Sequence, residues 1–151
     1  MTVDREKTKA GLIQEHEIVL EAADENLAEL LSFIERHLEE AACPLKAQMQ
    51  VCVVAEEVFI NIAHYAYTPD KGKAKVRLEI SSEPSVLTLT FIDRGKPYDP
   101  LAREDPDITL PIQERPIGGL GILLTKRMMD EAAYDYKDGQ NILTLKRRLS
   151  A

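Results

Sequence analysis

Residues 55–67 read AEEVFINIAHYAY and place a carboxylate, Glu57, and an amide, Asn61, inside an otherwise apolar run. Residues four apart lie one above the other on a helix, so these two side chains share one face. Neither glycine nor proline interrupts the chain between Pro44 and Tyr67, which predicts one long helix that starts at that proline. Because charged groups are rarely buried without partners, the shared face either meets solvent or lines a pocket.

The segments around this helix alternate in the pattern of an α+β domain. Asp24 is the expected N-cap of the helix that precedes it. The predicted order is a strand at 16–22, a helix at 23–41, the long helix, a hairpin at 73–93, a loop at 94–121, a helix at 121–133 and a second hairpin at 133–149. This order predicts a two-layer α/β sandwich, with a mostly antiparallel mixed sheet and the helices on one face.

Length, charge and hydropathy restrict the class of protein. The chain of 151 residues suits a single domain, for which we expect residues 14–151 after a flexible N-terminal segment at 1–13. A net charge of −7 argues against direct nucleic-acid binding, so the basic runs 126–127 and 146–148 are interpreted as solvated. No apolar run approaches the roughly 20 residues of a membrane helix, and no signal peptide is recognisable, which predicts a cytoplasmic protein without membrane contact.

Two further motifs lie far along the chain. In FIDRG, a predicted strand ends on Asp93, and Gly95 allows a ligand to approach the backbone closely. In RPIGGLG, a glycine cluster precedes a helix whose first N–H groups would be free to bind phosphate. The glycines of this cluster are Gly118, Gly119 and Gly121. Each motif is weak alone, and neither the P-loop nor the Rossmann fingerprint fits.

Together and in this order, the three motifs resemble the GHKL or Bergerat-fold ATPase domain shared by DNA gyrase, histidine kinases and MutL. That family carries a Glu and an Asn four apart on a long helix, a D-x-G at a strand end, and a G-x-G at a mobile lid. The chain looks most like the stand-alone anti-sigma-factor serine kinases, because the ATPase domain accounts for nearly all of it. The resemblance covers roughly residues 14–149.

The resemblance implies ATP and Mg²⁺ as cofactors and assigns a role to each motif. Glu57 would be the catalytic base, the Asn61 amide oxygen a Mg²⁺ ligand, and Asp93 the acceptor of a hydrogen bond from the adenine amine, with Gly95 beside the base. Further nucleotide-binding positions would be Thr109, Arg115, Gly118, Gly119 and Gly121, with Arg103 as second choice for the γ-phosphate.

The implied activity is that of a serine/threonine protein kinase in a partner-switching pathway. Such a kinase phosphorylates an anti-anti-sigma protein of the STAS type and sequesters a sigma factor; a homodimer is compatible with the resemblance. Lys96 and Pro97 stand where many relatives carry a second glycine, and the lid lacks a lysine. One alternative is therefore a nucleotide-gated binding protein without efficient phosphotransfer. Another, an acyl-CoA-dependent acetyltransferase, ranks lower, because Leu120 occupies a position that needs a small residue.

Overall fold

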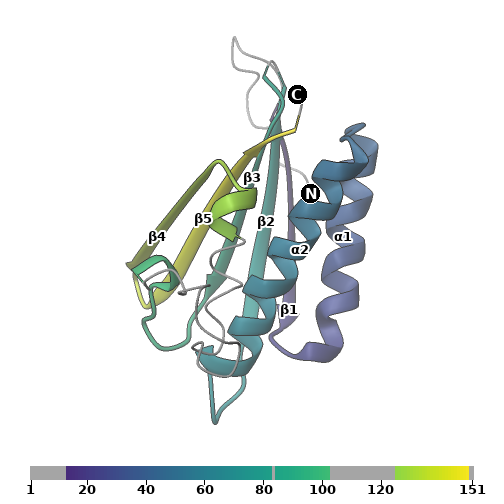
Figure 1. The fold of residues 1–151 in the computed structure, drawn as a ribbon. Coiled ribbons are helices and arrows are strands. Elements are labelled where there is room, and N and C mark those ends of the chain that lie inside the picture. The colour runs from purple at the N-terminus through teal and green to yellow at the C-terminus, as the bar shows by residue number, and fades with distance from the viewer. Residues whose placement is uncertain (1–12, 83, 103–124, 150–151) are drawn as a thin grey trace, which may run out of the picture.

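The computed structural model describes residues 13–82, 84–102 and 125–149. They form one antiparallel five-stranded sheet with two helices packed on the same face (Figure 1). The expected α+β sandwich is thus confirmed, and all neighbouring strands in the described sheet are antiparallel. The strand order is β1-β2-β3-β5-β4. The N-terminal segment expected to be flexible lies almost wholly outside the described residues.

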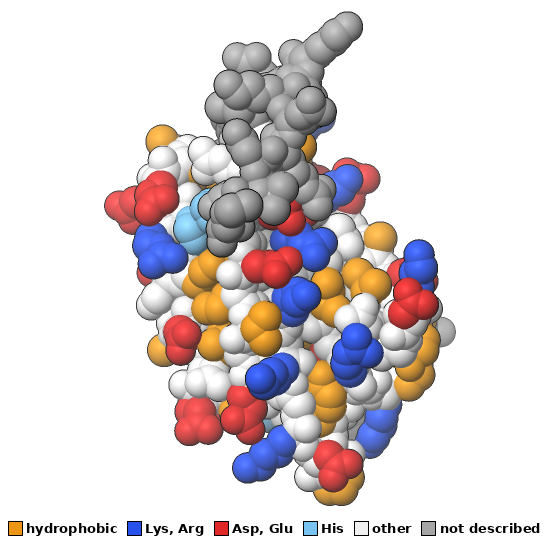
Figure 2. Space-filling view, turned by 180° about the vertical axis from the view of Figure 1, so that it is seen from behind, with side chains coloured by type: hydrophobic (Ala, Val, Ile, Leu, Met, Phe, Trp, Pro, Cys, Tyr) orange, Lys and Arg blue, Asp and Glu red, His pale blue; other side chains and the backbone are white. Residues whose placement is uncertain are grey.

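Alternation along the strands decides which side chains meet the helices. The strands are β1 (Ile13–Glu21), β2 (Lys73–Ser81), β3 (Val86–Asp93), β4 (Glu131–Lys137) and β5 (Gln140–Arg148). In β3, Leu87, Leu89 and Phe91 are buried on the helix side, and the same alternation turns Asp93 inward at the strand end. The opposite sheet face carries charged side chains of both signs among apolar ones (Figure 2).

The two helices supply the other half of the core. They are α1 (Leu27–Glu40) and α2 (Leu45–Asn61). Each contributes fully buried side chains, among them Ile34 from α1 and Phe59 from α2. A π-helical turn, Ile62–Ala66, continues α2, so the predicted uninterrupted helix from Pro44 is confirmed to within one residue of Tyr67. Widened turns of this kind are rare and frequently occur at functional sites.

Two predictions about local structure are wrong. Asp24 caps no helix: it begins a 3₁₀ turn, Asp24–Asn26, and the residue preceding α1 is Asn26. Of the helix expected at 121–133, residues 121–124 lie outside the described residues, and the described part is helical at 125–128, with β4 beginning at Glu131. Pairing with β5 overrides the helix preference of this segment, since Ala132 lies opposite the buried Leu145.

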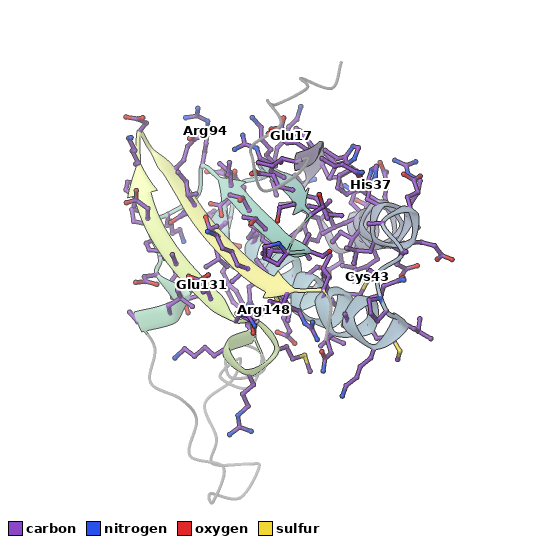
Figure 3. All side chains as sticks on the ribbon, turned by 90° about the horizontal axis from the view of Figure 1, so that it is seen from above. Glu17, His37, Cys43, Arg94, Glu131 and Arg148 are labelled. Carbon is purple, nitrogen blue, oxygen red and sulfur yellow. The ribbon has the colours of Figure 1, made fainter. Side chains whose placement is uncertain are left out.

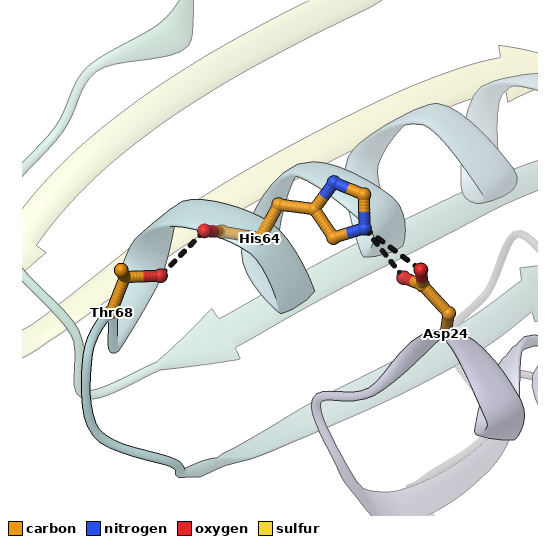
Figure 4. Close-up of polar contacts among 3 residues, drawn as sticks. All are labelled: Asp24, His64 and Thr68. Atoms are coloured by element: carbon orange, nitrogen blue, oxygen red, sulfur yellow. Dashed lines mark hydrogen bonds and ion pairs between the residues drawn. The ribbon is translucent and has the colours of Figure 1, made fainter.

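Asp24 instead joins the start of α1 to the π-helical turn (Figure 4). Both carboxylate oxygens contact Nε2 of His64, at 2.8 and 2.9 Å, and the Thr68 hydroxyl donates to the His64 carbonyl at 2.5 Å. This contact is on the surface, with the two side chains 61% and 47% exposed. His64 therefore ties two segments of the fold together.

The cysteines behave as structural thiols. Cys43 is buried and Cys52 is partly buried, and both are free. Burial, with the Glu35 carboxylate beside it, raises the pKa of Cys52 to about 11.

Among the described residues, none of the helices combines the length and apolar character that a membrane span requires.

Cys52 is expected to resist alkylation until the pH approaches its raised pKa. Because the reactive species is the thiolate, a rise from 9.0 to about 11 should slow iodoacetamide modification at pH 8.5 about 10- to 100-fold relative to the urea-unfolded chain. The same shift makes the folded state lose stability as the pH rises from 9 to 11. Mass spectrometry of timed reactions measures the rate, and equal rates in folded and unfolded chains would contradict the assignment.

Candidate nucleotide site

A cavity of about 530 Å³ opens between the end of α2, the end of β3 and the start of β5. Its walls are largely apolar, and a few polar side chains converge on it. Asn61 and Asp93 both line it, so the structure brings together two of the residues singled out in the sequence. The π-helical turn adds Tyr65, and the loop after β3 adds Lys96 and Tyr98.

Asp93 is held in one orientation by hydrogen bonds to a single oxygen. The Gly95 N–H donates to its Oδ1 at 2.8 Å, and the Asn141 side-chain amide donates to the same atom at 2.9 Å. Asp93 is only 7% exposed, yet it lines the cavity. Within the described part of the chain, Oδ2 makes no hydrogen bond and can accept one from a ligand. This is the chemistry needed to recognise an exocyclic amine.

Asn141, which the sequence analysis did not identify, holds this arrangement together. Its Nδ2 donates to Asp93 and, at 2.8 Å, to the Lys96 carbonyl. Its Oδ1 accepts from the Tyr98 N–H at 3.0 Å and from the Tyr134 hydroxyl. An amide offers two donor hydrogens and two acceptor lone pairs, so all four positions are used. Asn141 therefore orients the groups around a ligand and keeps no hydrogen-bonding capacity for the ligand itself.

One signal could have pointed to Asn141 before the structure was known. It stands two and four residues before Leu143 and Leu145, on the inward side of β5 where both leucines are buried. In the structure it lies directly opposite Asp93 in the β3–β5 register. A polar residue on the apolar side of a strand is costly unless it is paired. The sequence could not reveal its partner, because the pairing of β5 with β3 joins segments almost fifty residues apart.

The loop after β3 is fixed against the helix that precedes β2. Lys96 N–H donates to the Ala66 carbonyl at 2.9 Å, and a Cβ on Gly95 would lie 2.3 Å from that same oxygen. Gly95 is thus required by close packing against the π-helical turn, a reason that the sequence did not give. Tyr67 adds a second tie, since its hydroxyl accepts from the Arg94 N–H at 2.7 Å. Burial raises the pKa of the Tyr67 phenol above its ordinary value.

Asn61 and Glu57 differ in how they meet the cavity. Asn61 lines it, and among the described residues its side chain has no hydrogen-bond partner. A free amide oxygen facing a nucleotide-sized cavity suits Mg²⁺, which takes oxygen ligands and usually shares them with phosphates and water. Glu57 is half-buried one turn earlier on the same helix face, and it is not among the cavity-lining residues that the structure describes.

The remaining predicted positions cannot be placed. Thr109, Arg115, Gly118, Gly119 and Gly121, with Arg103, lie outside the described residues. Glu56, next to Glu57 on α2, is exposed. Asp99 accepts the Leu101 N–H at 2.8 Å just before the 3₁₀ turn Pro100–Ala102, so it is a loop carboxylate.

Comparison with known proteins agrees with the geometry. Residues 20–147 match the model of the histidine kinase-like ATPase domain. The chain belongs to this family. It is 30% identical over 101 residues to the serine/threonine-protein kinase BtrW of Bordetella bronchiseptica, an alignment that covers 67% of this chain and 69% of that protein. The family resemblance carried by the three motifs is thereby confirmed.

A solved structure shows the same fold. The crystal structure of the RsbU and RsbW domains of Rv1364c from Mycobacterium tuberculosis superposes with a TM-score of 0.66 over 91% of this chain, at 18% sequence identity. The chain spans 33% of the length of that protein's chain. At this identity the likeness supports the shared fold alone.

Replacing Asn141 by aspartate should make stability depend on pH. The substitution places a second carboxylate at hydrogen-bond distance from Asp93, and like charges raise the pKa of one member of such a pair. Protonation restores one hydrogen bond at low pH, so the free energy of unfolding should fall as the pH rises, with a loss of roughly 2–4 kcal/mol at pH 8. Urea unfolding at pH 5 and pH 8 measures it.

Gln140→Glu is the matched control for this prediction, because it makes the same amide-to-acid change one residue earlier on the same strand. Gln140 lies opposite Lys137 at the hairpin end and does not line the cavity. Its variant should follow the wild-type pH profile. A flat profile for Asn141→Asp would show that the four-bond arrangement is unimportant to the folded state.

Proposed function

We propose that this chain is an ATP- and Mg²⁺-dependent serine/threonine protein kinase that acts as an anti-sigma factor in a partner-switching pathway. It would phosphorylate a serine of a STAS-type anti-anti-sigma protein and sequester a sigma factor. Family membership supports ATP binding, and the likeness to BtrW supports the kinase reaction. The observation that carries the proposal is the unused Oδ2 of Asp93 in a largely apolar cavity that also contains the Asn61 amide.

The proposed adenine subsite follows from hydrogen-bond direction. A carboxylate can only accept, so the Oδ2 atom of Asp93 selects a base that offers an N–H at this point. Adenine offers its exocyclic amine, whereas guanine would present a carbonyl oxygen at the corresponding position. Tyr65 and Tyr98, which are 61% and 50% exposed at the cavity, are suited to cover the faces of a bound base.

The phosphates would extend from the base toward Asn61. When bound, Mg²⁺ would neutralise phosphate charge and align the transferred group. Asn61 would hold the metal through its amide oxygen. Glu57, one turn earlier on the same face, would accept the proton of the attacking serine hydroxyl. Lys96, exposed at the cavity, adds a positive charge on the protein side.

Glu57→Ala should abolish phosphotransfer and leave ATP affinity within about twofold. Loss of a general base typically lowers the rate 10²- to 10⁴-fold. ATP affinity should change little, because Glu57 does not line the described cavity and is not expected to contact the adenine ring. The rate is measured as transfer of labelled γ-phosphate to a STAS-type partner, and affinity by calorimetry with ATP in the presence and absence of Mg²⁺. Glu56→Ala, an exposed neighbour, is the control and should retain activity.

A second candidate function is a nucleotide-gated binding protein with little phosphotransfer. The position of Glu57 outside the described cavity lining favours it. The wild-type measurements separate the two: ATP binding with nucleotide-dependent partner binding but without transfer supports this second function. Absence of ATP binding would overturn both, and full activity of Glu57→Ala would overturn the assigned base.

A further inference from the structure

From the sequence alone, the basic runs 126–127 and 146–148 are interpreted as solvated. In the structure, residues from both runs line one hollow. This hollow, of about 440 Å³, lies between the start of α2, residues 127–130 and the end of β5. The cationic side chains that line it are Lys46, Arg127, Arg147 and Arg148. Figure 3 shows Arg148 at the end of β5, next to the helical turn of residues 125–128 and the start of α2. Four cations from three segments thus gather on a chain whose net charge is −7.

The carboxylate in the lining is already engaged. Asp130 Oδ2 accepts a hydrogen bond from the main-chain N–H of Arg148 at 2.6 Å. This bond joins the residue before β4 to the last residue of β5. Like charges brought together repel each other, and one carboxylate does not balance four cations. The charge of the hollow is therefore complementary to an anionic group from outside.

Arg147 is fixed in the wall of the hollow. It occupies an inward position of β5, two residues after the fully buried Leu145. Its guanidinium donates to the Gln50 side chain on α2 and, at 2.7 Å, to the Arg148 carbonyl. Its Nε is buried, and it has no hydrogen-bond partner among the described residues. These contacts hold the positive charge of Arg147 in place beside the hollow.

The start of α2 adds to the positive potential. Its N-cap is Pro44, and no side chain caps the helix. The first N–H groups of a helix have no partner within it and carry partial positive charge. Lys46 stands in this first turn, beside the hollow.

An exposed apolar stripe runs along α2 next to the hollow. Leu45, Met49 and Val53 are 70%, 61% and 42% exposed. Their spacing of four residues stacks them on one side of the helix. Gln50, which contacts Arg147, follows directly after Met49. Large apolar side chains exposed in a row and bordered by charges are typical of a protein-binding surface.

We propose that this stripe and the hollow together, the α2 docking surface, bind an acidic amphipathic segment of a partner protein. The cations would pair with carboxylates of that segment, and the stripe would cover its apolar side chains. A free phosphate would satisfy the cations only and leave the stripe exposed. The hollow lies at the start of α2, and the helix rises about 24 Å from Leu45 to Asn61 at 1.5 Å per residue. The stripe ends at Val53, still about 12 Å before Asn61. The hollow and the nucleotide cavity share none of the residues that line them.

The test uses the full chain and a 16-residue peptide with leucine on one helical face and glutamate elsewhere. Fluorescence anisotropy gives its Kd, and amide NMR shifts locate it. Arg127→Glu combined with Arg148→Glu should weaken binding at least ~10-fold, and Met49→Ser several-fold, as is typical of residues central to an interface. All three side chains are exposed or partly exposed, so the variants should fold. Binding should also weaken as salt is raised.

Matched controls separate this surface from general charge effects. Lys71→Glu combined with Lys137→Glu changes the net charge equally at exposed positions elsewhere, and Val19→Ser removes an exposed apolar side chain from β1. Both should leave the Kd within about twofold. Peptides with lysine for glutamate, or serine for leucine, should bind weakly.

Several outcomes would overturn the proposal. One is a Kd that the docking-surface variants and the control variants weaken equally. Another is a set of peptide-induced NMR shifts at Asn61 in place of Gln50, or the same shifts on addition of inorganic phosphate alone. The last is a chain that associates with itself and that the docking-surface variants dissociate. ATP titrations of the same samples keep this test independent of the proposed kinase: loss of ATP binding with intact peptide binding would affect the proposed function only.

Discussion

The amide of Asn141 is the constraint on which the candidate nucleotide cavity depends. It spends both hydrogens and both lone pairs on protein groups that come from β3, β4 and the loop after β3. Because it donates to Oδ1 of Asp93, the other carboxylate oxygen remains for a ligand. Because it also binds the Lys96 carbonyl and the Tyr98 N–H, the loop cannot move without breaking bonds to the sheet. One buried side chain thus sets both the recognition group and the margin of the cavity.

Much of the fold could be predicted because its signals are local. The alternation in β2 and β3 and the uninterrupted apolar helix before them are properties of neighbouring residues, and both were confirmed. The failures arose where distant contacts decide. The segment at 131–133 favours a helix by itself, but its pairing with β5 makes it a strand. Asp24 has the composition of a cap, but it is drawn to His64, forty residues away.

Some residues of the candidate site could likewise be predicted from the sequence, and others could not. Asn61 and Asp93 could be found from short motifs, since each stands at a characteristic place on its element, and the structure brings both to one cavity. Short motifs could not reveal the roles of Asn141, Tyr134 and Tyr98, because their hydrogen-bonded cluster depends on strand order and register. Even Gly95, correctly singled out, has a structural reason invisible in the motif: the Ala66 carbonyl occupies the space that a Cβ would need.

The polar residues of β5 show how one element can serve two surfaces. Its inward positions run from Asn141 through Leu143 and Leu145 to Arg147, so the apolar middle packs on the helices while a polar group stands at each end. Asn141 organises the nucleotide cavity, and Arg147 contacts Gln50 at the other end of α2. Both sites therefore rest on the same strand and the same helix. A shift of α2 along the sheet would break the Arg147–Gln50 contact at one end and, through the π-helical turn, the Lys96–Ala66 hydrogen bond at the other, which gives the two ends a physical route for coupling.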